Sequence, residues 1–437
     1  MPASRFPVGT FRIVVPAAGE EFGPTEGAQA VRDGTSPHAV TVFSGTAGVD
    51  FTQLNPASSQ ATNQTAITND TTGKVWWPKG TYNVTGSAYT FLQNTEYRWE
   101  SIAGYTRTSA DTAVMNGPGN ADGSFDAAAL TNSTFKGGKW QNFTSGITLN
   151  ASAILEDLEI TEVYNVGAGA STTGSNVRVT RCYCHTTGKY NLTAAGNSGA
   201  SITNVTIENC RLSDGNTRLN DFRFDAGSTK FLFVDGMVVS HNWSENNYGS
   251  GLWWDTKCVD VMCEENVIEN NEWSGFFYEA CGSGTTFRHN LLLNNGDPLS
   301  ADGANANFQI SSGDTEFYPG SNNNLILIEF NVFDGDGTQT SIWMHNGHDP
   351  RICRGIHIEN NEIWLRTASN NRAGGSNAGG QFAGEDLTWA GNQYYVGDLN
   401  ATKWHWDATQ FNATKTWAQW QALGFDTDAS GATRTLI

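Results

Sequence analysis

The segment V-M-C-E-E-N, residues 261–266, is the centre of a pattern that returns along this chain every 24 to 41 residues. Each copy ends at an anchor residue that apolar residues precede and follow in alternation. The downstream copies are T-T-F-R-H-N (285–290), L-I-E-F-N (327–331), I-H-I-E-N-N (356–361) and L-T-W-A-G-N (387–392). A repeat of this length indicates structural units that stack on one another. The sequence therefore predicts a solenoid, in which each coil contacts only its neighbours.

The anchor residues are predicted to form a ladder through the stack. Asparagine amides can hydrogen-bond to the next coil, and asparagine tolerates the turn conformations that link strands. The expected role of the ladder is structural rather than catalytic. Its predicted members are Asn242, Asn266, Asn290, Asn331, Asn361 and Asn392, with Cys210 and Cys182 in the two steps upstream.

Cys182 and Cys210 would lie one strand spacing apart, at about 5 Å. That distance is within reach of a disulfide. Both a disulfide and a row of small buried thiols remain open, and the second is favoured because nothing in the sequence indicates an oxidising compartment. The chain has seven cysteines, so at least one has no partner within it.

The composition predicts an all-β protein, because 48 glycines and many Asn, Asp, Ser and Thr residues separate short alternating apolar runs. The formal net charge of -19 disfavours nucleic acid and anionic membranes as partners. This net charge is compatible with a neutral, carbohydrate-like partner or with a partner bound through cations, and it is equally compatible with no more than a solvated exterior. No apolar run approaches the roughly 20 residues that span a bilayer. The N-terminus shows no secretory signal peptide, so we expect folding in a cytoplasm or a signal already removed.

Three regions are expected along the chain. Residues 1–65 are rich in Pro, Gly, Ala and Thr and predict an N-terminal arm or attachment module. Residues 66–395 carry the strands of the solenoid. Residues 396–437 are rich in tryptophan and predict a short helical cap, because an uncovered terminal strand would recruit other chains.

The segment V-W-W-P-K-G-T-Y-N-V (75–84) and the anchor repeat together allow a resemblance to be named. The pattern is similar to that of the right-handed parallel β-helix proteins of the pectate-lyase-like superfamily, over residues 70–395. That superfamily includes polysaccharide lyases, glycoside hydrolases, epimerases, and the tail spikes and minor tail proteins of bacteriophages. The resemblance implies the fold, a right-handed parallel β-helix, far more specifically than any one reaction.

A second register follows the anchors by about 13 to 19 residues. It predicts strands at D-F-R-F-D (221–225), G-L-W-W-D (251–255), G-F-F-Y-E (275–279), N-A-N-F-Q-I (305–310) and S-I-W-M-H (341–345). In a parallel stack these strands would present two outward strips. One strip would hold the candidate catalytic residues and Gln309, in the order Asp225, Asp255, Glu279, Gln309 and His345. The other would bind substrate through Arg223, Trp253, Phe277, Asn307 and Trp343.

Acidic side chains beside aromatic rings are typical of a sugar site, because rings stack on pyranose faces while carboxylates bind hydroxyls. Neighbouring coils would hold Asp255 and Glu279 about 5 Å apart, near the separation found in retaining glycosidases. Two carboxylates this close raise the pKa of one of them. On a hydrolytic interpretation Glu279 is the general acid, Asp255 is the nucleophile or base, and His345 is an auxiliary acid or base.

Other interpretations of the same row stay open. Carboxylates in a row can bind sugar hydroxyls or Ca²⁺ without turnover, or can form only a solvated face. A phase error of one residue would bury Trp253 and expose Trp254 instead.

Two classes of function are compatible with these patterns. The favoured one is a phage tail-type adhesin, virion-bound or extracellular, that recognises surface polysaccharide, and whether it also cleaves the glycan through the carboxylate row stays open. Its N-terminal arm would dock onto other tail proteins, and a homotrimer is compatible with it. The alternative is a free secreted polysaccharide lyase or glycoside hydrolase whose signal peptide has been removed.

Overall fold

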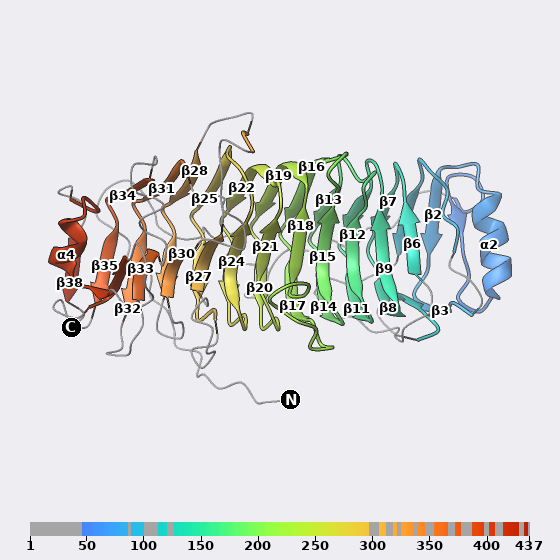
Figure 1. Ribbon diagram of the computed structural model, residues 1–437. Helices are drawn as coiled ribbons and strands as arrows, with labels where there is room; N and C mark the ends of the chain where they lie inside the picture. Colours follow the sequence, from blue (N-terminus) through green and yellow to red (C-terminus); the bar gives the residue numbers. More distant parts are fainter. Residues whose placement is uncertain are drawn as a thin grey trace.

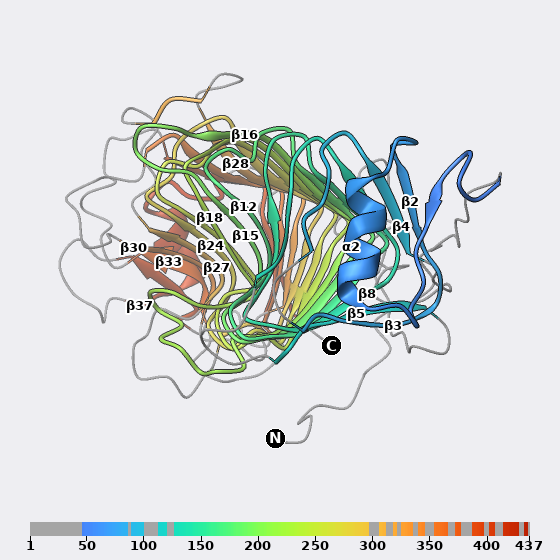
Figure 2. The same ribbon diagram turned by 90° about the vertical axis from the view of Figure 1, so that its right-hand side faces the viewer.

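The computed structural model describes residues 46–85, 89–99, 112–119, 126–296, 306–311, 318–320, 325–334, 340–345, 354–365, 372–376, 387–396, 402–406, 414–427 and 432–435. These residues form an elongated stack of coils, seen from the side in Figure 1 and along its length in Figure 2. Three long sheets run the length of the stack. From β4 to β36, strands three apart in the chain are neighbours in the same sheet, as expected of a solenoid in which each coil supplies one strand per sheet.

Sheet I and sheet II are parallel throughout the described strands. Sheet I contains β1 (Thr52–Gln53), β2 (Lys74–Trp77), β4 (Glu96–Trp99), β7 (Thr134–Lys136), β10 (Ile154–Glu156), β13 (Arg178–Thr180), β16 (Ile202–Glu208), β19 (Val234–Ser240), β22 (Val259–Glu264), β25 (Thr285–Arg288), β28 (Ile326–Glu329), β31 (Ile356–Glu359) and β34 (Leu387–Ala390). Sheet II contains β3 (Gly80–Asn83), β5 (Ala113–Asn116), β8 (Lys139–Phe143), β11 (Glu159–Val163), β14 (Tyr183–Thr187), β17 (Arg211–Gly215), β20 (Trp243–Glu245), β23 (Val267–Glu269), β26 (Leu291–Leu293), β29 (Val332–Asp334), β32 (Glu362–Leu365), β35 (Gln393–Val396) and β38 (Ala432–Thr435).

Sheet III is the sheet on which the second predicted register falls. It contains β6 (Asp126–Leu130), β9 (Ser145–Leu149), β12 (Val166–Ala170), β15 (Tyr190–Ala195), β18 (Thr229–Leu232), β21 (Leu252–Asp255), β24 (Ser274–Glu279), β27 (Ala306–Ser311), β30 (Thr340–His345), β33 (Arg372–Ser376), β36 (Trp404–Trp406) and β37 (Thr414–Lys415). Its strands are parallel except at the C-terminal end, where β37 pairs antiparallel with β36.

The predicted asparagine ladder is confirmed at the turn between sheets I and II. The Oδ1 atom of Asn266 accepts hydrogen bonds from the backbone N–H of Asn242 at 2.9 Å and from its side-chain amide at 3.0 Å. Asn290 receives the same pair of bonds from Asn266. The same contacts continue through Asn331, Asn361 and Asn392. Each amide therefore joins two coils while it is buried.

The two cysteines continue this ladder upstream as free thiols. The backbone N–H of Cys210 donates to Asn242 Oδ1 at 2.9 Å, and that of Cys182 approaches Cys210 Sγ at 3.4 Å. Both thiols are buried and form no disulfide, as is also true of the other cysteines in the described residues. Of the two open interpretations, the structure therefore has the row of buried thiols.

A second buried ladder was missed in the sequence. Asn247, Asn271, Asn295 and Asn307 repeat the contacts of the first ladder at the turn between sheets II and III. Their amides donate to the next Oδ1 at 2.7 Å, 2.8 Å and 3.0 Å in turn. For the first three the signal was present as a repeated N-x-x-x-N-N, in which the last asparagine follows the first-ladder residue by five positions, whereas Asn307 lies in β27 outside this motif.

Both ends of the stack carry a helix (Figure 1). α2 (Gln60–Thr68) lies at the N-terminal end, with Ser59 as its N-cap. α4 (Trp417–Gln421) lies at the C-terminal end, with Thr416 and Gln419 forming a capping box. Strands β36 and β38 follow residue 395 and still add to sheets III and II, so the sheets extend past that predicted boundary. Of the predicted N-terminal arm, residues 1–45 lie outside the described residues.

In the described part of the chain, neither helix has the length and apolarity to cross a bilayer.

Candidate active site

Asp255 and Glu279 lie side by side on sheet III, as the repeat predicted. They end β21 and β24, and the register pairs them directly across the two parallel strands. The residue before each, Trp254 and Tyr278, points into the coil and belongs to the central core. Because side chains alternate along a strand, both carboxylates must face outward. The alternation chosen from the sequence, with Asp255 outward and Trp254 inward, is therefore correct.

Glu279 is the carboxyl group of this pair that is set up to hold a proton near neutral pH. Burial raises the pKa of Glu279 from 4.5 to about 7, and the negative charge of Asp255 adds to the rise. Lys230 and a hydrogen bond from Trp253 Nε1 to Glu279 Oε2, at 3.2 Å, act in the opposite direction. A carboxyl group in this state can act as a general acid.

Asp255 is held by a cation that the sequence analysis did not find. Lys230 Nζ lies 3.0 Å from Asp255 Oδ2, and both side chains are largely buried. The same ammonium lies 3.7 Å from the centre of the Trp253 ring and donates to the carbonyl oxygen of Phe224 at 2.6 Å. Lys230 comes from β18, whose sequence T-K-F-L could have been recognised as the strand preceding β21 in the stack.

The predicted strand at residues 221–225 is wrong, because these residues form a turn. The coil from Cys210 to Asn242 is 32 residues long rather than 24, and the extra residues form a loop between β17 and β18. β18 then takes the place beside β21, with Leu232 opposite Asp255. Asp225 therefore lies off the row, where Tyr190 Oη donates to it at 2.9 Å and Lys189 pairs with it. Arg223 is exposed on the same loop.

The predicted register is also displaced by two residues in the coil of β27. Ser311, not Gln309, pairs with Glu279 and with His345, whose side chain lies outside the described residues. Gln309 instead pairs with Phe277 and Trp343, and its Oε1 accepts from Ser274 Oγ at 2.9 Å. Asn307 belongs to the second buried ladder and is 0% exposed, so it does not lie on the outward strip predicted for it.

The aromatic strip faces outward, yet other side chains cover it. Trp253 and Phe277 are 1% and 2% exposed, and they pack with Trp273 and Phe222 in a cluster separate from the central core. The Trp273 ring meets Trp253 at 5.7 Å and Phe277 at 4.9 Å, edge to face in both cases. The expectation that Trp253 is exposed for stacking on a sugar is therefore wrong. We call Trp253, Trp273, Phe277 and Phe222 the outer aromatic cluster.

Trp343, the last aromatic residue predicted in this strip, is 2% exposed and stands edge to face with His405.

A second carboxyl group with a raised pKa lies on sheet II and has a structural explanation. Burial raises the pKa of Glu245 to about 7, and the charge of Arg211 opposes this. Arg211 donates to Glu245 from Nε at 2.8 Å and from Nη2 at 2.6 Å, and it lies between the rings of Tyr183 and Trp243. Glu245 is held by two hydrogen bonds from one guanidinium, whereas Glu279 accepts one from the Trp253 indole, so Glu279 is the better candidate for a general acid.

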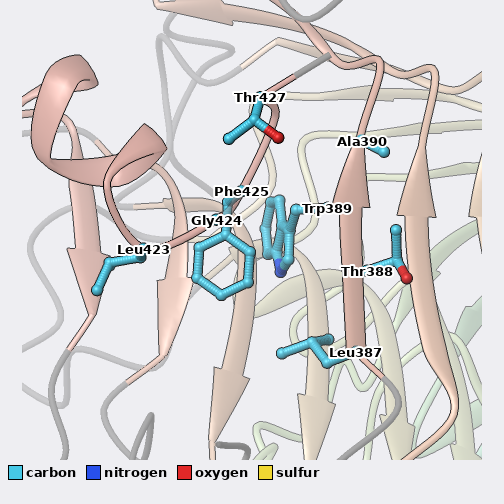
Figure 3. Close-up of a pocket in the computed structure, with 8 residues that line it drawn as sticks. All are labelled: Leu387, Thr388, Trp389, Ala390, Leu423, Gly424, Phe425 and Thr427. Atoms are coloured by element: carbon cyan, nitrogen blue, oxygen red, sulfur yellow. The ribbon is translucent and has the colours of Figure 1, made fainter. Parts of the chain in front are cut away.

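Among the described residues, no three His, Cys, Asp or Glu side chains are placed to hold a metal ion. A cavity of about 380 Å³ lies at the C-terminal end, between β34 and the segment that follows α4 (Figure 3). Its lining contains no ionisable side chain, so it offers no acid or base. The lining residues are Leu387, Thr388, Trp389, Ala390, Leu423, Gly424, Phe425 and Thr427.

Comparison with known proteins agrees with the geometry of the stack. Residues 145–318 match a family model described as a right-handed beta helix region. The protein is a right-handed parallel β-helix. The predicted fold is thereby confirmed. No curated protein matches the sequence.

Solved structures that resemble this chain differ widely from it in sequence. The A-module of mannuronan C-5 epimerase AlgE4 from Azotobacter vinelandii has a TM-score of 0.55 at 10% identity, over 83% of this chain and 96% of its own. The Dettilon tailspike protein has a TM-score of 0.43 at 12% identity, over 81% of this chain and 70% of its own. A GH87 alpha-1,3-glucanase from Streptomyces thermodiastaticus has a TM-score of 0.46 at 12% identity, over 85% of this chain and 66% of its own.

Proposed function

We propose that this β-helix binds a polysaccharide along the outer face of sheet III and hydrolyses it between Asp255 and Glu279. The observation that supports this proposal is the pairing of the two carboxyl groups on adjacent strands. One of them, Glu279, has a pKa of about 7, whereas the other is paired with the ammonium of Lys230. Hydrolysis of a glycosidic bond requires two neighbouring carboxyl groups in different states, one that donates a proton and one that is ionised.

In this mechanism Glu279 donates its proton to the glycosidic oxygen as the bond between that oxygen and the anomeric carbon breaks. Adjacent parallel strands lie about 4.8 Å apart, which favours the shorter carboxyl separation of retaining enzymes. Asp255 would then attack the anomeric carbon and form a glycosyl ester. A water molecule, deprotonated by Glu279, would release the sugar and restore both carboxyl groups. Lys230 positions Asp255 in the resting state.

The test is a screen of purified protein for new reducing ends released from a panel of bacterial and algal polysaccharides. Asp255→Asn and Glu279→Gln should each lower turnover by about 10²- to 10⁴-fold. Glu162→Gln, which changes an exposed carboxylate on β11, is the matched control and should leave turnover unchanged. Release at the wild-type rate by the double variant Asp255→Asn/Glu279→Gln would refute the proposed catalytic pair.

The other interpretations of the site predict different products. A lyase would also release reducing ends, but one product of each cleavage would carry an unsaturated non-reducing end that absorbs ultraviolet light, which hydrolysis does not produce. A binding protein would retain a polysaccharide without releasing either product. His345 belongs to the same proposal as an auxiliary acid or base, because its strand position extends the row from Glu279 through Ser311.

The biological setting predicted from the sequence is part of the proposal as well. We favour a virion tail adhesin that cleaves surface glycan, with residues 1–65 attaching to other tail proteins, over a free secreted enzyme. Light scattering of the purified chain would show whether it forms the trimer compatible with a tail protein. A pull-down with residues 1–65 against tail proteins encoded nearby would test the attachment. A monomer that captures none of them would favour the free enzyme.

A further inference from the structure

The loop of residues 216–226, which joins β17 to β18, is fixed at its base by two asparagines. Asn216 is fully buried, and its Nδ2 donates to the carbonyl oxygens of Asn220 and Tyr248, both at 2.9 Å. Asn216 Oδ1 accepts from the backbone N–H of Asn220 at 2.8 Å, while Asn220 Nδ2 donates to Gly188 at 2.9 Å. These bonds tie the loop to the coils on both sides of it.

The outer half of the loop is fixed as well. Phe222 packs edge to face against Tyr248 at 5.2 Å and against Trp273 at 5.9 Å, so it closes the outer aromatic cluster. Asp225 accepts from Tyr190 Oη at 2.9 Å. The carbonyl oxygen of Phe224 accepts from Lys230 Nζ at 2.6 Å. These contacts thus fix the backbone of Phe224 and the residues on both sides of it.

The Phe224 side chain has no such cover. It is 74% exposed, and of the large hydrophobic side chains exposed in the described residues it is the aromatic one. Its ring lies 5.5 Å from Lys230 Nζ, and that ammonium also contacts Asp255 at 3.0 Å. Phe224 therefore stands beside the carboxylate pair, on a loop that contacts of other residues already fix. A rigid exposed ring of this kind binds a flat apolar surface at little further cost in conformational entropy.

We propose that Phe224 is a stacking platform for a sugar unit next to the glycosidic bond that Asp255 and Glu279 attack. This proposal rests on the proposed function and adds a binding subsite to it. Trp253, Phe277 and Trp273 of the outer aromatic cluster cannot fill this role, because their rings are buried. Its part is to support the loop that presents Phe224. The apolar face of a pyranose is the chemistry that an exposed phenyl ring selects, whatever the charge on the sugar.

The test compares Phe224→Ala, Phe224→Trp and Leu219→Ala in gels and turnover assays with alginate, polygalacturonate, dextran and bacterial capsular polysaccharides. Leu219 is the matched control, since it is 67% exposed on the same loop. With the polysaccharide that wild-type protein binds, Phe224→Ala should weaken retention and raise KM about tenfold with little change in kcat. Phe224→Trp should retain binding, and Leu219→Ala should match wild type.

The outcomes separate this proposal from the one on which it rests. Wild-type affinity in Phe224→Ala, together with loss of turnover in Glu279→Gln, would overturn the stacking role and leave the catalytic pair intact. Equal loss in Phe224→Ala and Leu219→Ala would overturn it too, because the effect would then belong to the loop as a whole. If wild-type protein neither binds nor cleaves any of the polysaccharides, the proposed function and the subsite both fail. An unchanged thermal midpoint in Phe224→Ala would show that a loss of binding comes from the missing ring.

Discussion

Replacing Glu279 by glutamine should make the protein more stable at pH 8 but not at pH 4.5. The folded state holds the proton of Glu279 up to a pKa of about 7, whereas an unfolded chain releases it near 4.5. Between these two values the folded state binds more protons than the unfolded state, so the free energy of unfolding falls as pH rises. Above about pH 7 the Glu279 side chain is ionised in both the folded and the unfolded state, so the free energy that the folded state loses by burying this charge is constant. Glutamine removes this loss and keeps an oxygen that accepts from Trp253.

The size of the effect follows from the same two values. At about 1.4 kcal/mol per pH unit, the interval from 4.5 to about 7 gives an upper limit of roughly 3 kcal/mol. Glu279 is only partly buried, and solvent screening lowers the expected gain to about 2 kcal/mol. Urea unfolding followed by tryptophan fluorescence at pH 4.5 and pH 8 measures the difference, with Glu162→Gln as the surface control. The reasoning is refuted if Glu279→Gln changes the free energy of unfolding equally at both pH values.

Three further predictions concern the residues around the site and in the core. Lys230→Met should move the basic limb of the pH–rate profile to higher pH, because the charge of Lys230 lowers the pKa of Glu279; an unchanged limb would mean that Lys230 does not influence the acid. Asn266→Ala should cost about 3 kcal/mol in urea unfolding, because buried groups of Asn242 and Val239 lose their partners. The exposed control Asn83→Ala should cost less than about 0.5 kcal/mol, and similar losses in both variants would contradict the ladder's role. The six cysteines that are buried in the described residues should react with a thiol reagent only after unfolding, and fast labelling of more than one thiol per native chain would contradict their burial.

The sequence was sufficient for the repeating architecture, because each coil obeys the same local rules. An anchor with a fixed offset to an alternating strand predicts the asparagine ladder, the parallel sheets and the side from which each side chain projects. Trp254 in the core, with Asp255 and Glu279 outside it on adjacent strands, follows from that period of two. The same regularity also contained the first three residues of the second ladder, in the repeated N-x-x-x-N-N.

Only the tertiary structure decided which side chains share a coil edge and which are covered. A loop inserted in one coil moved Asp225 and Arg223 off the row and put Lys230 beside Asp255. The length of an insertion changes which residues of neighbouring coils pair, but it leaves unchanged the alternation of side chains along each strand. Trp253 faces outward as predicted, yet Trp273 and Phe222 return over it from other segments of the chain. The side from which a residue projects is a local property of a strand, whereas its exposure depends on where distant loops fold back, and no local pattern encodes that.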